Sequence, residues 1–128
     1  MRILVDTHII LWAAANQVSE KVKSILENPN NTLYFSSASI WEIEIKNSRG
    51  KEDFNVDAKR LCLNLRFAGY EELGIISEHA FLISDLPKIH KDPFDRIMIA
   101  QALYEDMFFL TDDKILIKYP GSIIYAGN

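Results

Sequence analysis

Four acidic residues of this sequence stand at the ends of expected strands or in the first turns of expected helices. They are Asp6, Glu42, Asp95 and Asp113. The first and the last follow short apolar runs, at 3–5 and 107–110, which indicate buried strands. Ligands bind outside the carboxyl ends of the strands in open parallel sheets. If these strands share one sheet, the four carboxylates converge at one edge of it.

Clustered carboxylates repel one another and therefore need a positive counter-charge. A set of oxygen ligands alone, without histidine or thiolate, suits hard cations, so the expected ion is Mg²⁺, with Mn²⁺ as a substitute. Such ions activate water and neutralise developing charge in phosphodiester hydrolysis. The pattern therefore predicts a metal-dependent hydrolase in which the acids hold the metal and no side chain acts as nucleophile.

Each acid also has a purely structural interpretation. Asp6 can be a turn former, and Asp95 can interact favourably with the dipole of its helix. Glu42 can close a capping box or pair with Lys46 one turn later. Asp113 can be the N-cap of a short helix. Taken singly, the structural interpretation is favoured for every one of them, and only their common placement favours chemistry.

The elements that must position these acids alternate between strand and helix. Strands are expected at 3–5, 33–35, 73–76, 107–110 and 122–126, and helices at about 9–15, 20–27, 41–46, 57–68, 78–84 and 93–105, with a short one from 114. This alternation predicts an α/β sandwich around a mostly parallel sheet. With 128 residues and no break in composition, the chain is expected to form one domain, residues 1–128.

One segment is ambiguous. Residues 41–46 alternate strictly between apolar and charged side chains, which alone indicates a strand. Ser39 followed by Glu42 has the form of a capping box, however, and the preceding serines, Ser36 and Ser37, offer caps as well. A helix here also continues the alternation of elements, so we predict a helix. Further caps are predicted at Ser77 and at Asp92, which precedes a proline at the first helical position.

Composition restricts the partners and the compartment. The net charge is −4, and no basic stripe of the kind that marks a non-specific nucleic-acid binder is present. A single cysteine excludes an internal disulfide and indicates a reducing compartment, so the cytoplasm is expected. The apolar N-terminal run is too short for a signal peptide or a membrane span.

Four segments together resemble the PIN-domain nucleases and, more closely, the VapC-type toxins of bacterial toxin–antitoxin pairs. They are Leu-Val-Asp-Thr-His at 4–8, Ser-Ala-Ser-Ile-Trp-Glu-Ile at 37–43, Asp-Pro-Phe-Asp-Arg at 92–96 with Ile-Ala-Gln-Ala at 99–102, and Thr-Asp-Asp at 111–113. The resemblance covers nearly the whole chain, with the motifs in order and suitably separated.

The resemblance implies a three-layer α/β/α sandwich with a central, mostly parallel sheet. It also implies Mg²⁺-dependent endonucleolytic cleavage of RNA. By the family pattern the metal-binding and catalytic acids fall on Asp6, Glu42, Asp95 and Asp113, and Asp112 could share the role of Asp113. Thr111, Asp112, Lys46 and Arg96 are candidates for substrate binding.

The resemblance further implies a cognate antitoxin and a homodimer, without a membrane. The apolar residues 9–12 could support such interfaces, although a place in the core is favoured for them. The histidines His8, His79 and His90 are isolated in the sequence, and we expect no part in the chemistry for them.

Two other classes of protein share part of this pattern. A receiver-type phosphoacceptor domain has similar length, but it needs paired acids after the first strand and an aspartate after the central one. Here Asp6 stands alone, and Ser77 and Glu78 follow the third strand. A non-catalytic RNA-binding or regulatory module on the same fold should have lost one of the four acids, and all four are present.

Overall fold

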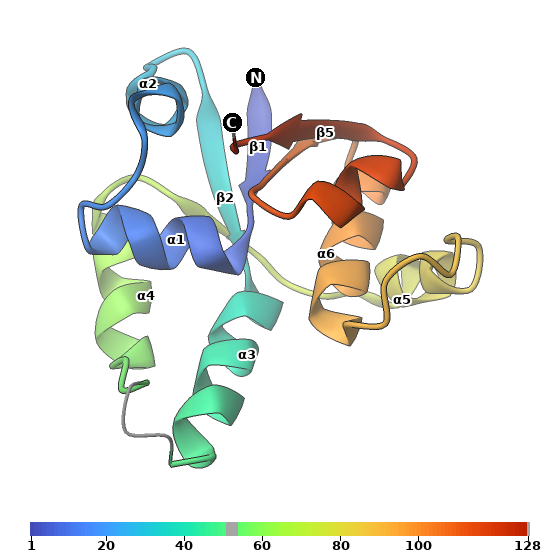
Figure 1. Cartoon of the computed structure of the whole chain (residues 1–128), viewed down its shortest axis with the longest axis horizontal. Coiled ribbons are helices and arrows are strands. Elements are labelled where there is room, and N and C mark those ends of the chain that lie inside the picture. Colours follow the sequence, from blue (N-terminus) through green and yellow to red (C-terminus); the bar gives the residue numbers. More distant parts are fainter. Residues whose placement is uncertain (51–53, 128) are drawn as a thin grey trace.

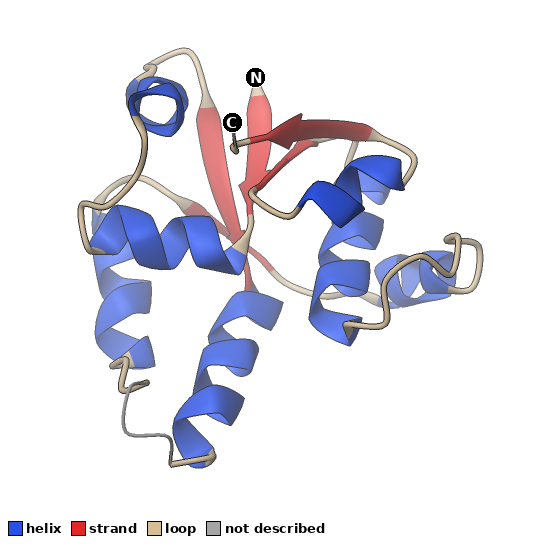
Figure 2. Cartoon of the chain, in the orientation of Figure 1, coloured by secondary structure: helices blue, strands red, loops and turns tan. Residues whose placement is uncertain are grey.

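The computed structural model describes residues 1–50 and 54–127. A five-stranded parallel sheet lies between two groups of helices (Figures 1 and 2). Its strands are β1 (Arg2–Val5), β2 (Thr32–Ser36), β3 (Glu71–Leu73), β4 (Phe108–Thr111) and β5 (Ser122–Tyr125). The helices are α1 (Thr7–Ala14), α2 (Glu20–Glu27), α3 (Ser37–Ser48), α4 (Ala58–Phe67), α5 (Ser77–Ile83), α6 (Pro93–Tyr104) and the 3₁₀ helix η1 (Lys114–Lys118). The predicted α/β/α sandwich is confirmed.

Strand β1 is the centre of the sheet, whose order is β3-β2-β1-β4-β5. It pairs in parallel with β2 on one side, where Val5 lies opposite Phe35. It pairs with β4 on the other, where Val5 lies opposite Leu110. The carboxyl ends of β1, β2 and β4 are therefore neighbours at one edge of the sheet, which is the edge that the acidic residues follow.

The alternation of side chains along β1 builds two hydrophobic cores. Ile3 and Val5 point to the face covered by α1, α2 and α4, whereas Leu4 points to the face covered by α5, α6 and η1. All three side chains are fully buried. Ile9 and Ile10 of α1 belong to the first core, as the sequence favoured. A strand buried on both faces explains why this segment is continuously apolar.

The predicted caps are confirmed at Asp92 and Asp113. Asp92 accepts hydrogen bonds from the backbone N–H groups of Phe94 and Asp95, and Asp113 accepts one from Ile115. The prediction of a cap at Ser39 was wrong, because α3 begins at Ser37 and Ser36 is its N-cap. The helix predicted for this segment is confirmed, and the earlier start lengthens it by an additional turn.

Two predictions around the third strand were also wrong. The strand is Glu71–Leu73 and not 73–76, because the chain leaves the sheet edge at Gly74, whose carbonyl accepts a hydrogen bond from Gln101. Helix α5 begins at Ser77 itself, so Ser77 is not its cap. Ile76 is the N-cap, and its backbone N–H donates to Nδ1 of His79.

Buried His79 joins the start of α5 to the end of α6. Its side chain is 1% exposed, and Nε2 lies 2.8 Å from Oε2 of Glu105. Since Nδ1 accepts from Ile76, Nε2 carries the proton and donates to Glu105. His79, which is isolated in the sequence, therefore has a structural role.

We expect His79→Ala to lower the free energy of unfolding by about 2–3 kcal/mol, because it leaves a cavity and two polar groups without a partner. Urea unfolding followed by circular dichroism measures this. His8→Ala, at a half-exposed histidine, is the matched control and should change stability by less than about 0.5 kcal/mol. An equal effect of the two substitutions would contradict the role assigned to His79.

Among the described helices, none has both the length and the apolar character needed to cross a membrane.

Candidate active site

Asp6 lies at the carboxyl end of β1, directly against β4. Its backbone N–H donates to the carbonyl of Leu110 at 2.9 Å, so the sheet ladder extends to this residue. Its carboxylate is the N-cap of α1, accepting from the N–H of Thr7, and it accepts a second bond from the hydroxyl of Thr111, both at 2.7 Å. Asp6 is only 4% exposed, so the surrounding protein restricts its side chain to this position.

Thr111 connects Asp6 to Asp113. Its Oγ1 donates to Oδ2 of Asp6 and accepts the backbone N–H of Asp113 at 3.1 Å. Asp113 uses Oδ1 to cap η1 through the N–H of Ile115. Its Oδ2 faces the cluster instead. Thr111 is fully buried, so in this structure its hydroxyl orients the two acids.

Asp95 comes from the first turn of α6, which Asp92 and Pro93 begin. Its side chain is 15% exposed and faces the ends of the strands. Burial raises the pKa of Asp95 from the ordinary 3.8 to about 8, with further contributions from the negative charges of Asp6, Asp92, Glu42 and Asp113. The acids from β1, α3, α6 and the end of β4 therefore lie close enough for their charges to act on Asp95.

Glu42 lies on the second turn of α3 and is 7% exposed. Its Oε2 lies 3.2 Å from Nζ of Lys46, so the ion pair considered from the sequence is present. Its Oε1 is buried and has no hydrogen-bond partner among the described residues. A buried carboxylate oxygen without a donor is costly unless a ligand satisfies it.

Burial also dominates at Asp6. It raises the pKa of Asp6, with a small addition from the negative charge of Asp112, and the hydrogen bonds from Thr111 and Thr7 and the charge of His8 oppose it, so that the pKa is about 6. A bound cation would favour the ionised form of such buried acids. With its mainly oxygen donors and the free Glu42 Oε1, the cluster fits a hard divalent cation.

Two groups of hydrogen bonds connect the helices and strands that carry the acids. The hydroxyl of Ser36 donates to Oε1 of buried Gln101 at 2.6 Å, and Nε2 of Gln101 donates to the carbonyls of Leu73 and Gly74. Helix α6 is thereby fixed to the ends of β2 and β3. The hydroxyls of Thr7 and Ser39 share a hydrogen bond of 2.7 Å, which links α1 to α3.

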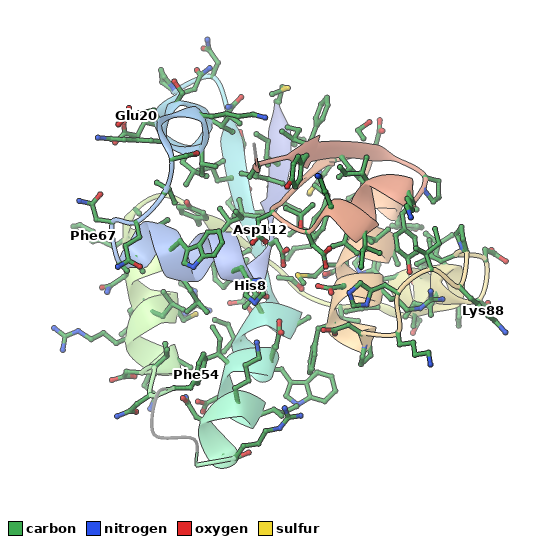
Figure 3. The ribbon with its side chains drawn as sticks, in the orientation of Figure 1. His8, Glu20, Phe54, Phe67, Lys88 and Asp112 are labelled. Atoms are coloured by element: carbon green, nitrogen blue, oxygen red, sulfur yellow. The ribbon has the colours of Figure 1, made fainter. Side chains whose placement is uncertain are left out.

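The predicted substrate-binding residues lie in different surroundings. Lys46 is beside Glu42 at the rim of the cluster. Asp112 lies next to His8, with Nδ1 of the histidine 3.7 Å from its Oδ1 (Figure 3). Arg96 points away from the acids and donates to the carbonyls of Ile83 and Pro87 and to the hydroxyl of Tyr119. Its donors are used within the protein.

His90 is isolated in the sequence, but the structure brings it to the acids. Its Nε2 lies 3.3 Å from Oδ2 of Asp113 and 3.6 Å from Oδ2 of Asp95. One ligand atom from each of these three residues lies within 4.8 Å of the others. His90 precedes the Asp92–Pro93 helix start by two residues, and no periodic pattern marks it, so the sequence alone had no signal for it.

A groove opens beside Glu42, between α3 and the segment that enters α6. Its volume is about 370 Å³. It is lined by Glu42, Ile45, Lys46, Arg49, Lys91, Asp92, Pro93 and Phe94. At its mouth Trp41, which is 59% exposed, contacts the ring of Phe94 edge-on, with 5.1 Å between the ring centroids. The groove thus combines three cationic side chains with aromatic surface next to the acids.

Comparison with protein families assigns the fold. A model of the PIN domain matches residues 3–122, nearly the whole chain. The chain belongs to the PIN domain family. This PIN domain has no match among curated proteins. Membership of the family supports a nuclease role for the chain.

Solved structures share the fold of this PIN domain over almost its full length. VapBC2 from Rickettsia felis, bound to a DNA fragment from its promoter, matches with a TM-score of 0.75 at 16% identity, over 98% of each chain. DNA-bound VapBC from Salmonella typhimurium gives 0.70 at 14%, also over 98% of each chain. A toxin–antitoxin complex from Klebsiella pneumoniae gives 0.64 at 19%, over 97% of each chain.

Proposed function

We propose that this PIN domain is a Mg²⁺-dependent endoribonuclease. The observation that supports this most strongly is the buried acidic cluster itself, in which Glu42 Oε1 has no hydrogen-bond donor among the described residues and burial raises the pKa of both Asp6 and Asp95. Lys46 supplies only one positive charge beside these four acids.

In this proposal Asp6, Glu42, Asp95 and Asp113 hold the cation. When bound, the cation supplies Lewis-acid activation of the attacking water and neutralises charge that develops on the phosphoryl group. The protein contributes by fixing its ligands in advance. Thr111 orients Asp6 and Asp113, and Lys46 holds one oxygen of Glu42 while leaving the other unoccupied. Asp112 adds negative charge beside Asp6.

We infer that the substrate strand passes through the groove beside Glu42. Lys46, Arg49 and Lys91 line it, and neither Arg49 nor Lys91 is ion-paired with an acid in the described part of the chain. Cations in a groove neutralise phosphates, and the exposed indole of Trp41 offers a surface on which a base stacks. The groove gives a local basic path on a protein whose net charge is −4.

Neutralising two of these cations tests the path. The double variant Arg49→Gln and Lys91→Gln is expected to raise the KM for single-stranded RNA about 10-fold, with little change in kcat, and to reduce the salt slope of binding by about 1.4. The control is Lys23→Gln with Lys59→Gln, two exposed cations of α2 and α4. If both double variants weaken RNA binding equally, the groove is not the path.

Cleavage of a pool of structured RNAs tests the activity itself. Purified wild-type protein is expected to cut the pool internally with Mg²⁺, to stop in EDTA, and to resume when Mg²⁺ is restored. Sequencing the ends would identify the target. Binding of the RNA with no metal-dependent cleavage of any member would favour a non-catalytic module on this fold.

We further propose that the chain is the toxin of a toxin–antitoxin pair, acting in the cytoplasm as a homodimer. Its support is the fold shared with the VapBC and toxin–antitoxin complexes. Expression alone is then expected to arrest growth, whereas Asp6→Asn or co-expression of the adjacent gene restores it. Light scattering gives the oligomeric state. Normal growth with active protein in the cell would contradict the toxin role and leave the nuclease proposal standing.

A further inference from the structure

The imidazole of His90 is held in one tautomer by the backbone of the helix start. Its Nδ1 accepts a hydrogen bond from the N–H of Asp92 at 3.0 Å. An acceptor at Nδ1 cannot carry a proton, so in the neutral ring the proton lies on Nε2. The ring therefore presents an N–H to the side where Asp95 and Asp113 lie.

The backbone of His90 is equally restrained. Its N–H donates to the hydroxyl of Tyr119 at 2.8 Å, and that hydroxyl donates back to the carbonyl of His90 at 3.3 Å. Tyr119 is 4% exposed and also accepts from Arg96 at 3.2 Å. The ring is thus fixed from the end of η1 and from the start of α6, which are the two elements next to Asp113 and Asp95.

We propose that His90 is a positioning residue that donates Nε2–H to Oδ2 of Asp113, beside Oδ2 of Asp95, and that it is not a ligand of the metal. Its role in catalysis rests on the proposed nuclease function, whereas its tautomer and its exclusion from the ligand set rest on contacts within the chain. By its proximity alone His90 would be counted with Asp95 and Asp113 as a third ligand.

The hydrogen bond from the N–H of Asp92 distinguishes a hydrogen-bond donor at Nε2 of His90 from a metal ligand there. A metal ligand needs a lone pair at Nε2, which moves the proton to Nδ1. There it would face the N–H of Asp92, and two donors would meet at 3.0 Å. A donor at Nε2 satisfies both ends of the ring at once. It can hold Oδ2 of Asp113 through one lone pair and leave the second lone pair of that oxygen to the cation, as hydrogen-bonded carboxylate ligands commonly do.

Nitrogen NMR of the metal-free protein tests the tautomer without any activity assay. With ¹⁵N-labelled histidine, Nε2 of His90 is expected to bear the proton, and adding Mg²⁺ is expected to leave it protonated. An unprotonated Nε2, or loss of its proton when Mg²⁺ binds, would overturn the proposal. This NMR measurement of the protonation of Nε2 does not depend on whether the protein cleaves RNA.

Two substitutions test the positioning role. His90→Gln places an amide donor near the position of Nε2, and His90→Asn places an amide oxygen near Nδ1 and has no group that reaches the acids. We expect Asn to weaken Mn²⁺ binding and to lower kcat by about 10–100-fold with KM unchanged, and Gln to restore most of the loss. Circular dichroism verifies that both variants fold.

An exposed acid far from the cluster provides the control. Asp106 precedes β4 at the opposite edge of the sheet, so Asp106→Asn should change neither quantity. Equal Mn²⁺ affinity in His90→Asn and wild type would overturn the positioning role, as would equal losses in the Asn and Gln variants. If wild type binds Mn²⁺ as expected but cleaves no RNA, the proposed function fails, while the affinity series still decides the role of His90.

Discussion

The Asp6→Asn variant is expected to lose at least about 100-fold in kcat for RNA cleavage while it remains folded. The amide keeps the shape of the side chain, its oxygen can accept from the N–H of Thr7, and its NH2 group can donate to the hydroxyl of Thr111. It removes the negative charge of the most buried of the four acids. At this position little water is available to replace the carboxylate as a ligand of the cation. The measurement is single-turnover cleavage at saturating Mg²⁺.

The matched control for this substitution is Asp106→Asn. Asp106 is exposed and precedes β4, so it lies at the opposite edge of the sheet, and asparagine tolerates its positive φ of 55°. Full activity in the control with loss in Asp6→Asn supports the assignment. Wild-type rates in Asp6→Asn would exclude Asp6 from the active site.

The second large effect concerns stability in the absence of metal. Asp95 has a pKa of about 8 in the folded protein and about 3.8 when unfolded, so between these values the folded state binds more protons. Stability therefore falls as the pH rises from about 4 to 8, and Asp6 adds the same sign up to about 6. Each pKa unit corresponds to about 1.4 kcal/mol, so the melting temperature should fall by several degrees.

Asp95→Asn isolates the contribution of this residue. In EDTA at pH 8 the variant is expected to melt at a higher temperature than wild type, and at pH 4 the difference should disappear. Mg²⁺ should raise the melting temperature of wild type at pH 8 and have little effect on the variant, because binding to the folded state stabilises it. A variant less stable than wild type in EDTA at pH 8 would show that Asp95 is not under electrostatic strain.

The acids that converge in the structure could be predicted because local signals marked their elements. Asp92 with Pro93 indicated the helix that carries Asp95, and the apolar runs before Asp6 and at 107–110 indicated adjacent buried strands. In a parallel sheet the ends of such strands meet at one edge, so placement followed from topology alone. The resemblance of four sequence motifs to the PIN-domain nucleases then supplied the order of these motifs along the chain.

Features decided by contacts between distant segments could not be predicted. The backbone N–H of Ile76 is taken by His79 and the carbonyl of Gly74 by Gln101, so an apolar stretch that resembled a strand leaves the sheet. Ser39 binds Thr7 of another helix and does not cap its own. His90 reaches the acids only because Tyr119 of η1, 29 residues away, holds its backbone.

Direct titration with Mn²⁺, followed by electron paramagnetic resonance and competed with Mg²⁺, tests the central claim without knowledge of the RNA target. The wild-type protein is compared with Asp6→Asn combined with Asp95→Asn, and with Asp106→Asn as control. We predict saturable Mn²⁺ binding that Mg²⁺ displaces in wild type and control, and its loss in the double variant. Equal binding by all three proteins, or none by wild type, would contradict the assignment of this carboxylate cluster as a metal site.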